Sequence, residues 1–195
     1  MKHLKKFNEM NVSIDTAKET LESMFPEIEK LEPIGSGKLG HAYLGTIGYD
    51  MVVVKMTNSL SEYLLTKIAM VSNPPHTVKF HKAEIIDEDK YLYAIVHDYV
   101  SRDAMPDEET WDLAVGYING IVSDEKVSKV IITREQKYEF ELAKKKISEL
   151  EEYFDTSIDT LQQNWGYNDN QELVIFDLDG DISRPKYEKL IQKYK

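Results

Sequence analysis

Four side chains near the end of the chain are of the types that hold a divalent cation or move a proton. Val174 to Ser183 reads VIFDLDGDIS, an apolar run that ends in Asp177 and Asp179. Upstream, four residues separate Asp159 from Asn164, and twelve separate Asn164 from Asp177. Carboxylate and carboxamide oxygens are ligands that Mg²⁺ accepts in proteins. The spacing predicts a hairpin that delivers Asn164 and Asp177 to one edge, with Asp159 as a candidate base.

A candidate phosphate-binding turn lies in the N-terminal half. Gly35-Ser36-Gly37-Lys38-Leu39-Gly40 has the pattern G-x-G-x-x-G. The sequence HAYLGT that follows alternates like a strand, which excludes the helix that a dinucleotide site requires, and no Lys-Ser or Lys-Thr marks a Walker loop. What remains is a strand–turn–strand whose glycine backbone can lie close to phosphates. An ordinary hairpin with glycine in its turn is the alternative.

Two further features of the same half favour a ligand site. Lys55 ends the apolar run MVVVK, so its ammonium is expected to point from the sheet toward whatever the sheet covers. Glu62, the only acid in the helix predicted to follow, is a candidate partner that fixes Lys55 in place. VHDYV at 96–100 closes the second hairpin, where exposed backbone N–H and C=O groups can meet the edge of a planar base. A lysine in water and a plain linker are the alternatives.

Composition limits the classes of function. The chain has 195 residues, a net charge of −11 and no cysteine, which excludes disulfides, thiolate catalysis and zinc–thiolate sites and fits a reducing cytoplasm. Phosphate contacts need basic patches, so no nucleic acid is expected as a partner. No apolar stretch is long enough for a membrane span or a secretory signal. A basic host or partner protein remains an alternative, and the oligomeric state is not predicted.

Hydrophobic patterns predict a strand-rich half followed by a helical half. We expect residues 1–30 to form an N-terminal helical extension, 31–100 a strand-rich lobe and 101–195 a helical lobe with the metal-ligand hairpin. The stretch 126–133, KVSKVIIT, is predicted as a strand or a loop. Helices are predicted at 13–24, 59–71, 107–122, 134–154 and 184–195, and the last strand at 172–179.

The Asp-x-Asp motif resembles the nucleophile motif of the haloacid-dehalogenase-like phosphatases. That family places the motif on the first strand of a doubly wound sheet, with many further residues after it. Here the sequence ends 15 residues after Gly180, and Asp181 stands where the family has threonine or valine. We therefore expect the chain not to be a phosphatase of this kind.

From about Leu31 to Gly180 the chain resembles a protein-kinase-like fold, most closely the short kinase-like proteins of bacterial viruses. The resemblance implies an α+β, two-lobed fold with an antiparallel β-sheet N-lobe and a reduced helical C-lobe. It also implies ATP and Mg²⁺ as cofactors and a cytoplasmic location. The roles it implies are a glycine-rich loop for Gly35, Gly37 and Gly40; an α/β-phosphate lysine for Lys55, with Glu62 as its partner; a gatekeeper for His97 and a hinge for Asp98, Tyr99 and Val100; a catalytic base for Asp159; and magnesium ligands for Asn164 and Asp177, with Asp179 beside them.

Several positions depart from the kinase pattern. Ser157-Ile158 replaces His-Arg before the base. Ala42 stands where a valine usually covers adenine, and Val53 stands where an alanine usually makes room for it. Asp177-Leu178-Asp179 lacks the glycine of Asp-Phe-Gly. The sequence ends 18 residues after Asp177, too few for a peptide-binding platform. Three hypotheses follow: an active minimal kinase with an unknown acceptor; an inactive kinase-like protein that engages a basic partner through its acidic surface; or an unrelated α+β domain with accidental spacings.

Overall fold

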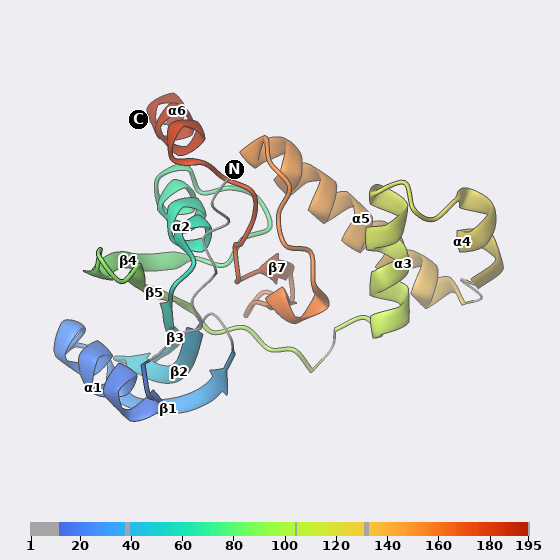
Figure 1. Cartoon of the computed structure of the whole chain (residues 1–195). Coiled ribbons are helices and arrows are strands. Elements are labelled where there is room, and N and C mark those ends of the chain that lie inside the picture. The colour runs from blue at the N-terminus through green and yellow to red at the C-terminus, as the bar shows by residue number, and fades with distance from the viewer. Residues whose placement is uncertain (1–11, 38–39, 104, 131–132, 195) are drawn as a thin grey trace. The chain divides into compact units, whose positions relative to one another are not determined.

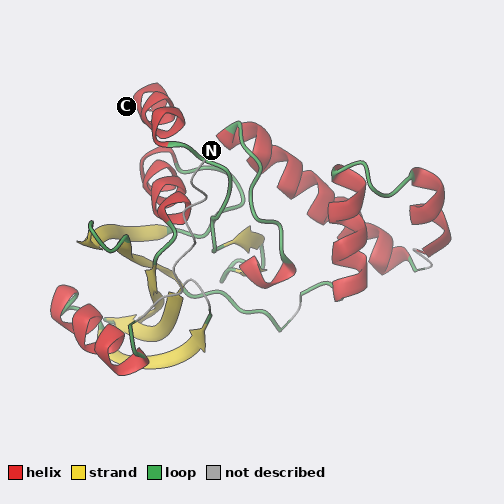
Figure 2. Cartoon of the chain, in the orientation of Figure 1, coloured by secondary structure: helices red, strands yellow, loops and turns green. Residues whose placement is uncertain are grey.

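The chain divides into two units, which are described separately below. The computed structural model describes residues 12–37, 40–103, 105–130 and 133–194. The first unit comprises Met1–Met70 and Lys79–Tyr99, and the second comprises Val71–Val78 and Val100–Lys195. Figure 1 labels the elements, and Figure 2 colours the helices and strands in the same orientation.

An antiparallel sheet of five strands is the framework of the first unit. The strands lie in the order β1-β2-β3-β5-β4, so β1 and β4 are the edges. In β2 and β3 every residue from Gly40 to Ile47 pairs with one from Thr57 to Asp50, without a bulge. Gly48, at a φ of +64°, makes the tight turn between these two strands. The strands are β1 (Glu29–Ser36), β2 (Gly40–Ile47), β3 (Asp50–Thr57), β4 (Phe80–Asp87) and β5 (Leu92–Asp98).

Helix α1 (Ile14–Met24) covers one face of this sheet. Ser13 caps it by accepting a hydrogen bond from the Thr16 N–H. Ala17 and Leu21, four residues apart on one side of the helix, are fully buried. They belong to one core with alternate residues of the central strands, so α1 is part of the first unit's core. Its members are Ala17, Leu21, Phe25, Ile28, Leu31, Tyr43, Val52, Val54, Met56, Ala94 and Val96.

Helix α2 (Leu60–Ser72) lies against the opposite face. Successive side chains of a strand point to opposite faces, so Lys55, between the core residues Val54 and Met56, points away from α1. On that side the Tyr93 ring of β5 stacks on the Tyr63 ring of α2, with centroids 4.6 Å apart. The central strands are therefore covered on both faces, and their run of apolar residues reflects this double burial.

Helices make up most of the second unit: α3 (Glu108–Ile118), α4 (Asp124–Val130), α5 (Arg134–Phe154) and α6 (Arg184–Tyr194). Thr133 and Gln136 form a capping box that begins α5. Asp155, at a φ of +49°, ends it in the left-handed conformation. The buried side chains of α5 recur every three or four residues, as expected for a helix with one face in a core. They are Phe140, Ala143, Ile147, Leu150 and Phe154.

A short hairpin, β6 (Trp165–Tyr167) and β7 (Leu173–Ile175), completes the second unit after the 3₁₀ turn η1 (Gln162–Asn164). Thr77 bridges Ile175 in parallel, and Ser101 bridges Tyr167. Ile175 donates its N–H to the His76 carbonyl at 2.8 Å. The His76 ring contacts Glu149 at 2.5 Å and Lys146 at 3.0 Å on α5. The hairpin is therefore tied to segments distant in sequence.

The structure confirms the α+β class, the antiparallel sheet and the helical character of the second half. The predicted strand at 172–179 was too long. The Phe176 N–H still bonds to the Asn164 carbonyl in the register of the hairpin, but the Asn164 N–H donates to the Leu161 carbonyl and gives no bond in return, so β7 ends at Ile175. The prediction of a strand or loop at 126–133 was wrong for its first part, which belongs to α4; Ile131 and Ile132 lie outside the described residues. None of the described helices is both long and apolar enough to cross a membrane.

We predict that Leu21→Ala destabilises the first unit by about 2–5 kcal/mol, since it opens a cavity where α1 meets the sheet. Ser23→Ala, on the exposed side of the same helix, is the control and should change stability by less than about 0.5 kcal/mol. Urea unfolding of both variants checks this. Equal and small effects would show that α1 does not contribute to this core.

Candidate functional site

Lys55 and Glu62 form an ion pair on the α2 face of the sheet. The Lys55 Nζ lies 2.8 Å from the Glu62 Oε1, and the Glu62 side chain is 4% exposed. The pair forms because α2 begins almost directly after β3. Ser59 accepts a hydrogen bond from the Glu62 N–H at 3.2 Å, which starts the helix within two residues of the strand end. The ammonium of Lys55 is thus fixed on one face of the sheet.

The glycine hairpin between β1 and β2 is closed by a hydrogen bond from the Gly37 N–H to the Gly40 carbonyl at 2.8 Å. A Cβ at Gly40 would lie 2.3 Å from the Met56 carbonyl oxygen, so strand packing requires this glycine. A Cβ at Gly35 or Gly37 would meet no atom within 4 Å. At these two positions the described chain leaves the backbone open to a ligand. Lys38 and Leu39 of the motif lie outside the described residues.

The segment from His97 to Val100 has much of its hydrogen bonding satisfied internally. The buried His97 ring donates from Nδ1 to the Asp98 carbonyl at 2.8 Å. The Asp98 N–H donates to the Lys79 carbonyl, and the Tyr99 N–H to the Met51 carbonyl. A carbonyl oxygen has two lone pairs, so that of Asp98 can still accept from a ligand. The role of Asp98 and Val100 as a hinge stays a prediction.

His81 was not singled out from the sequence, yet it holds the Asp98 side chain. Its Nε2 lies 2.5 Å from the Asp98 Oδ1, across the pair of strands β4 and β5. Only the register of those strands brings the two residues together, and no local sequence pattern announces it.

In the second unit, backbone hydrogen bonds bring Asp159, Asn164, Asp177 and Asp179 together. The Asp159 N–H donates to the Asp179 carbonyl at 2.6 Å. The Asn164 carbonyl accepts from the Asp177 N–H at 3.4 Å, and the Asn164 Nδ2 donates to the Asp159 carbonyl at 3.4 Å. Three short segments therefore converge. Their roles as base and metal ligands stay predictions.

The donor atoms of this cluster fit a hard cation such as Mg²⁺, because all are oxygens. Asn164 is buried, and its Nδ2 is the amide atom turned to Asp159, so Oδ1 is the atom available to a ligand. One oxygen of Asp179 accepts from the Gly180 N–H at 2.8 Å, and one oxygen of Asp159 accepts from the Leu161 N–H at 3.1 Å. Within the described residues, no group of three or more His, Asp or Glu is placed to hold a metal alone.

Glu151 is a second residue that the sequence did not single out. Its Oε1 accepts from the Ile158 N–H at 3.4 Å and so fixes the residue before Asp159. Burial raises the pKa of the Glu151 carboxyl, against the smaller opposing effect of this hydrogen bond. Glu151 stands among several exposed acids of α5, so composition gave no signal that it differs from them.

Comparison with known proteins found no matching family model and no matching curated protein. Among solved structures, the chain is similar to aminoglycoside phosphotransferase APH(4)-Ia, with a TM-score of 0.45 and 10% identity, over 85% of this chain and 71% of the other. It is also similar to the Cydia pomonella granulovirus kinase PK-1, with a TM-score of 0.45 and 14% identity, over 84% of this chain. The chain spans 57% of that kinase. Likeness at this level carries no information on activity.

The Lys55–Glu62 pair is the feature of the chain's own architecture that most resembles a protein kinase. In the first unit a lysine on the third strand pairs with a glutamate on the helix that follows, which is the lysine–glutamate arrangement of protein kinases. In the sequence, that helix comes between the third and fourth strands of the five-stranded antiparallel sheet.

We predict that Gly40→Ala destabilises the sheet by about 1–3 kcal/mol, since the methyl group clashes with the backbone of β3. Gly37→Ala is the matched control and should fold with nearly wild-type stability. Chemical denaturation of both variants measures the difference. Equal losses would contradict the assignment of Gly40 as the packing glycine.

A second prediction concerns the pH dependence of stability. The folded state binds the Glu151 proton more tightly than the unfolded state, so wild-type stability falls as pH rises from the ordinary carboxyl pKa through the raised one. Glu151→Gln keeps an acceptor for Ile158 and has no proton to lose. We expect its melting temperature, relative to wild type, to increase across that pH range and then level off. Glu152→Gln, on the exposed side of α5, should show no such trend in thermal melts.

Proposed function

We propose that this protein binds ATP with Mg²⁺ and transfers its γ-phosphoryl group to an acceptor. The observation that carries the proposal is the Lys55–Glu62 pair at 2.8 Å, with Glu62 buried. An ion pair of this kind holds a lysine ammonium in a fixed position, where it can neutralise phosphate charge. Phosphoryl transfer depends mainly on such positioning and charge stabilisation.

The second unit contributes the remaining groups of the proposal. Asn164 and Asp177 would hold Mg²⁺, with Asp179 beside them, and the bound ion would neutralise charge on the phosphates. Asp159 would orient the acceptor hydroxyl and take its proton. In the first unit, the open backbone at Gly35 and Gly37 is available to phosphate oxygens. Asp98 of the first unit and Val100 of the second would offer backbone groups to the adenine ring.

Release of ADP by the purified chain, measured with Mg²⁺-ATP, tests the proposal. We expect Asp159→Asn to lower the rate by about 10²–10⁴-fold through loss of the base. Asp177→Ala and Lys55→Met should also abolish release, and Lys90→Met, an exposed lysine on the β4–β5 turn, should leave it unchanged. Rates that do not respond to Asp159 or Asp177 would refute phosphoryl transfer by these residues.

A kinase-like protein that binds nucleotide without transferring phosphate is the second candidate. Ile158 is buried where the kinase pattern has arginine before the base, so this position brings no cation to the cluster. A Mg²⁺-dependent increase in melting temperature with ATP, without ADP release, would favour this candidate. An acidic chain of net charge −11 would then act by engaging a basic partner.

A further inference from the structure

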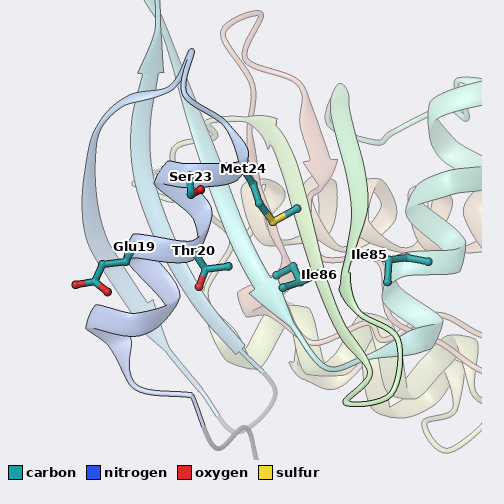
Figure 3. Close-up of a pocket in the computed structure, with 6 residues that line it drawn as sticks. All are labelled: Glu19, Thr20, Ser23, Met24, Ile85 and Ile86. Atoms are coloured by element: carbon teal, nitrogen blue, oxygen red, sulfur yellow. The ribbon is translucent and has the colours of Figure 1, made fainter.

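A groove of about 540 Å³ runs between α1 and the edge strand β4 in the first unit. Glu19, Thr20 and Ser23 of α1 make its polar part, and Met24 of α1 with Ile86 of β4 makes its apolar part (Figure 3). It is open to solvent along its length. The lining residues are Glu19, Thr20, Ser23, Met24, Ile85 and Ile86.

The apolar part of the groove exists because β4 has no neighbour on its outer side. Ile86 packs against the core beneath α1, while Ile85 points to the other side of the strand and is 44% exposed (Figure 3). Register shifts at both ends of β4 interrupt its pairing, and the Lys67 ammonium donates to the Ala83 carbonyl at 3.3 Å. Strand addition is therefore obstructed along this edge, and a ligand must be held by side chains.

The charge at the groove is negative. Glu84 lies on the same face of β4 as Ile86, two residues away. Among the residues that the structure describes, neither Glu19 nor Glu84 forms an ion pair. The neighbouring acids differ, since Glu22 pairs with Lys18, Glu27 with Lys82 and Asp87 with Lys90.

We propose that the α1–β4 groove binds a basic segment of another protein, one that places a lysine or arginine beside an apolar side chain. The cation would meet Glu19 and Glu84, and the apolar side chain would cover Met24 and Ile86. An open groove encloses little of a small molecule, which usually needs a concave site that buries most of its surface. A protein segment extends past the groove and gains contacts on both sides, and the acidic chain attracts it.

The test uses the full chain and an arrayed library of short extended peptides that alternate lysine or arginine with apolar residues. Peptides with glutamate in place of the basic residues, and the polyamine spermine, are the comparison ligands. Affinities come from fluorescence anisotropy. Methyl NMR of Met24 and Ile86 locates the bound peptide.

We expect library peptides to bind and to shift these methyl signals, and the double variant Glu19→Lys/Glu84→Lys to weaken binding about tenfold or more. Glu152→Lys/Glu188→Lys, two exposed acids of the second unit, changes the net charge equally and should leave the affinity nearly unchanged. Equal losses in both double variants, equal binding of spermine, or no shift at Met24 and Ile86 would each overturn the proposal. Lys55→Met should not alter peptide binding, so this inference stands or fails separately from nucleotide chemistry.

Discussion

The burial of the Glu62 carboxylate is the constraint on which the rest of the first unit's chemistry depends. A carboxylate taken out of water is costly unless a cation or hydrogen bonds compensate it. At 3% exposure Glu62 needs Lys55, and the 2.8 Å pair fixes both the rotation of α2 and the position of the ammonium. This ammonium is held close to the sheet and has little freedom to move. A phosphate that reached it would meet a preorganised charge, which is the condition under which electrostatic catalysis is effective.

The cluster in the second unit is built on a different principle. Backbone bonds join Asn164 to the segment leading into Asp177 and Asp159 to Asp179, and the Asn164 side chain adds a bond to the Asp159 carbonyl. The Asp159 carboxylate accepts from the Leu161 N–H, and an amide oxygen can accept in the same way. Asp159 can therefore be exchanged for asparagine with little effect on these bonds. Loss of activity in such variants would report on chemistry, whereas substitution of Glu62 or Lys55 affects packing and charge together.

Local sequence patterns predicted the structural features that interactions between neighbouring residues determine. The short interval between Lys55 and Glu62 required a helix that starts at once, and the Ser59 cap provides that start. Sequence patterns failed where contacts between residues distant in the sequence determine the structure. The residues after Ile175 alternate like a strand, but the ladder ends there because the Asn164 N–H donates to the Leu161 carbonyl instead of to this segment. Periodicity predicted the helix at α1 but not its place over Val54 and Met56, since shape complementarity among distant residues sets that contact. The pairing of His81 with Asp98 depends on strand register in the same way.

The position of α1 also separates two surfaces within the first unit. Lys55 points to the α2 face of the sheet, while the α1–β4 groove opens on the other side, with Val54 and Met56 of the same strand between them. A partner in the groove would therefore touch none of the first unit's proposed nucleotide-binding residues. Any influence on them would have to pass through β3 and β5, whose side chains are close-packed on both faces. Such cores transmit strain because they have few alternative packings. A partner in the groove and a nucleotide at Lys55 would therefore occupy opposite faces of one sheet, so neither would exclude the other.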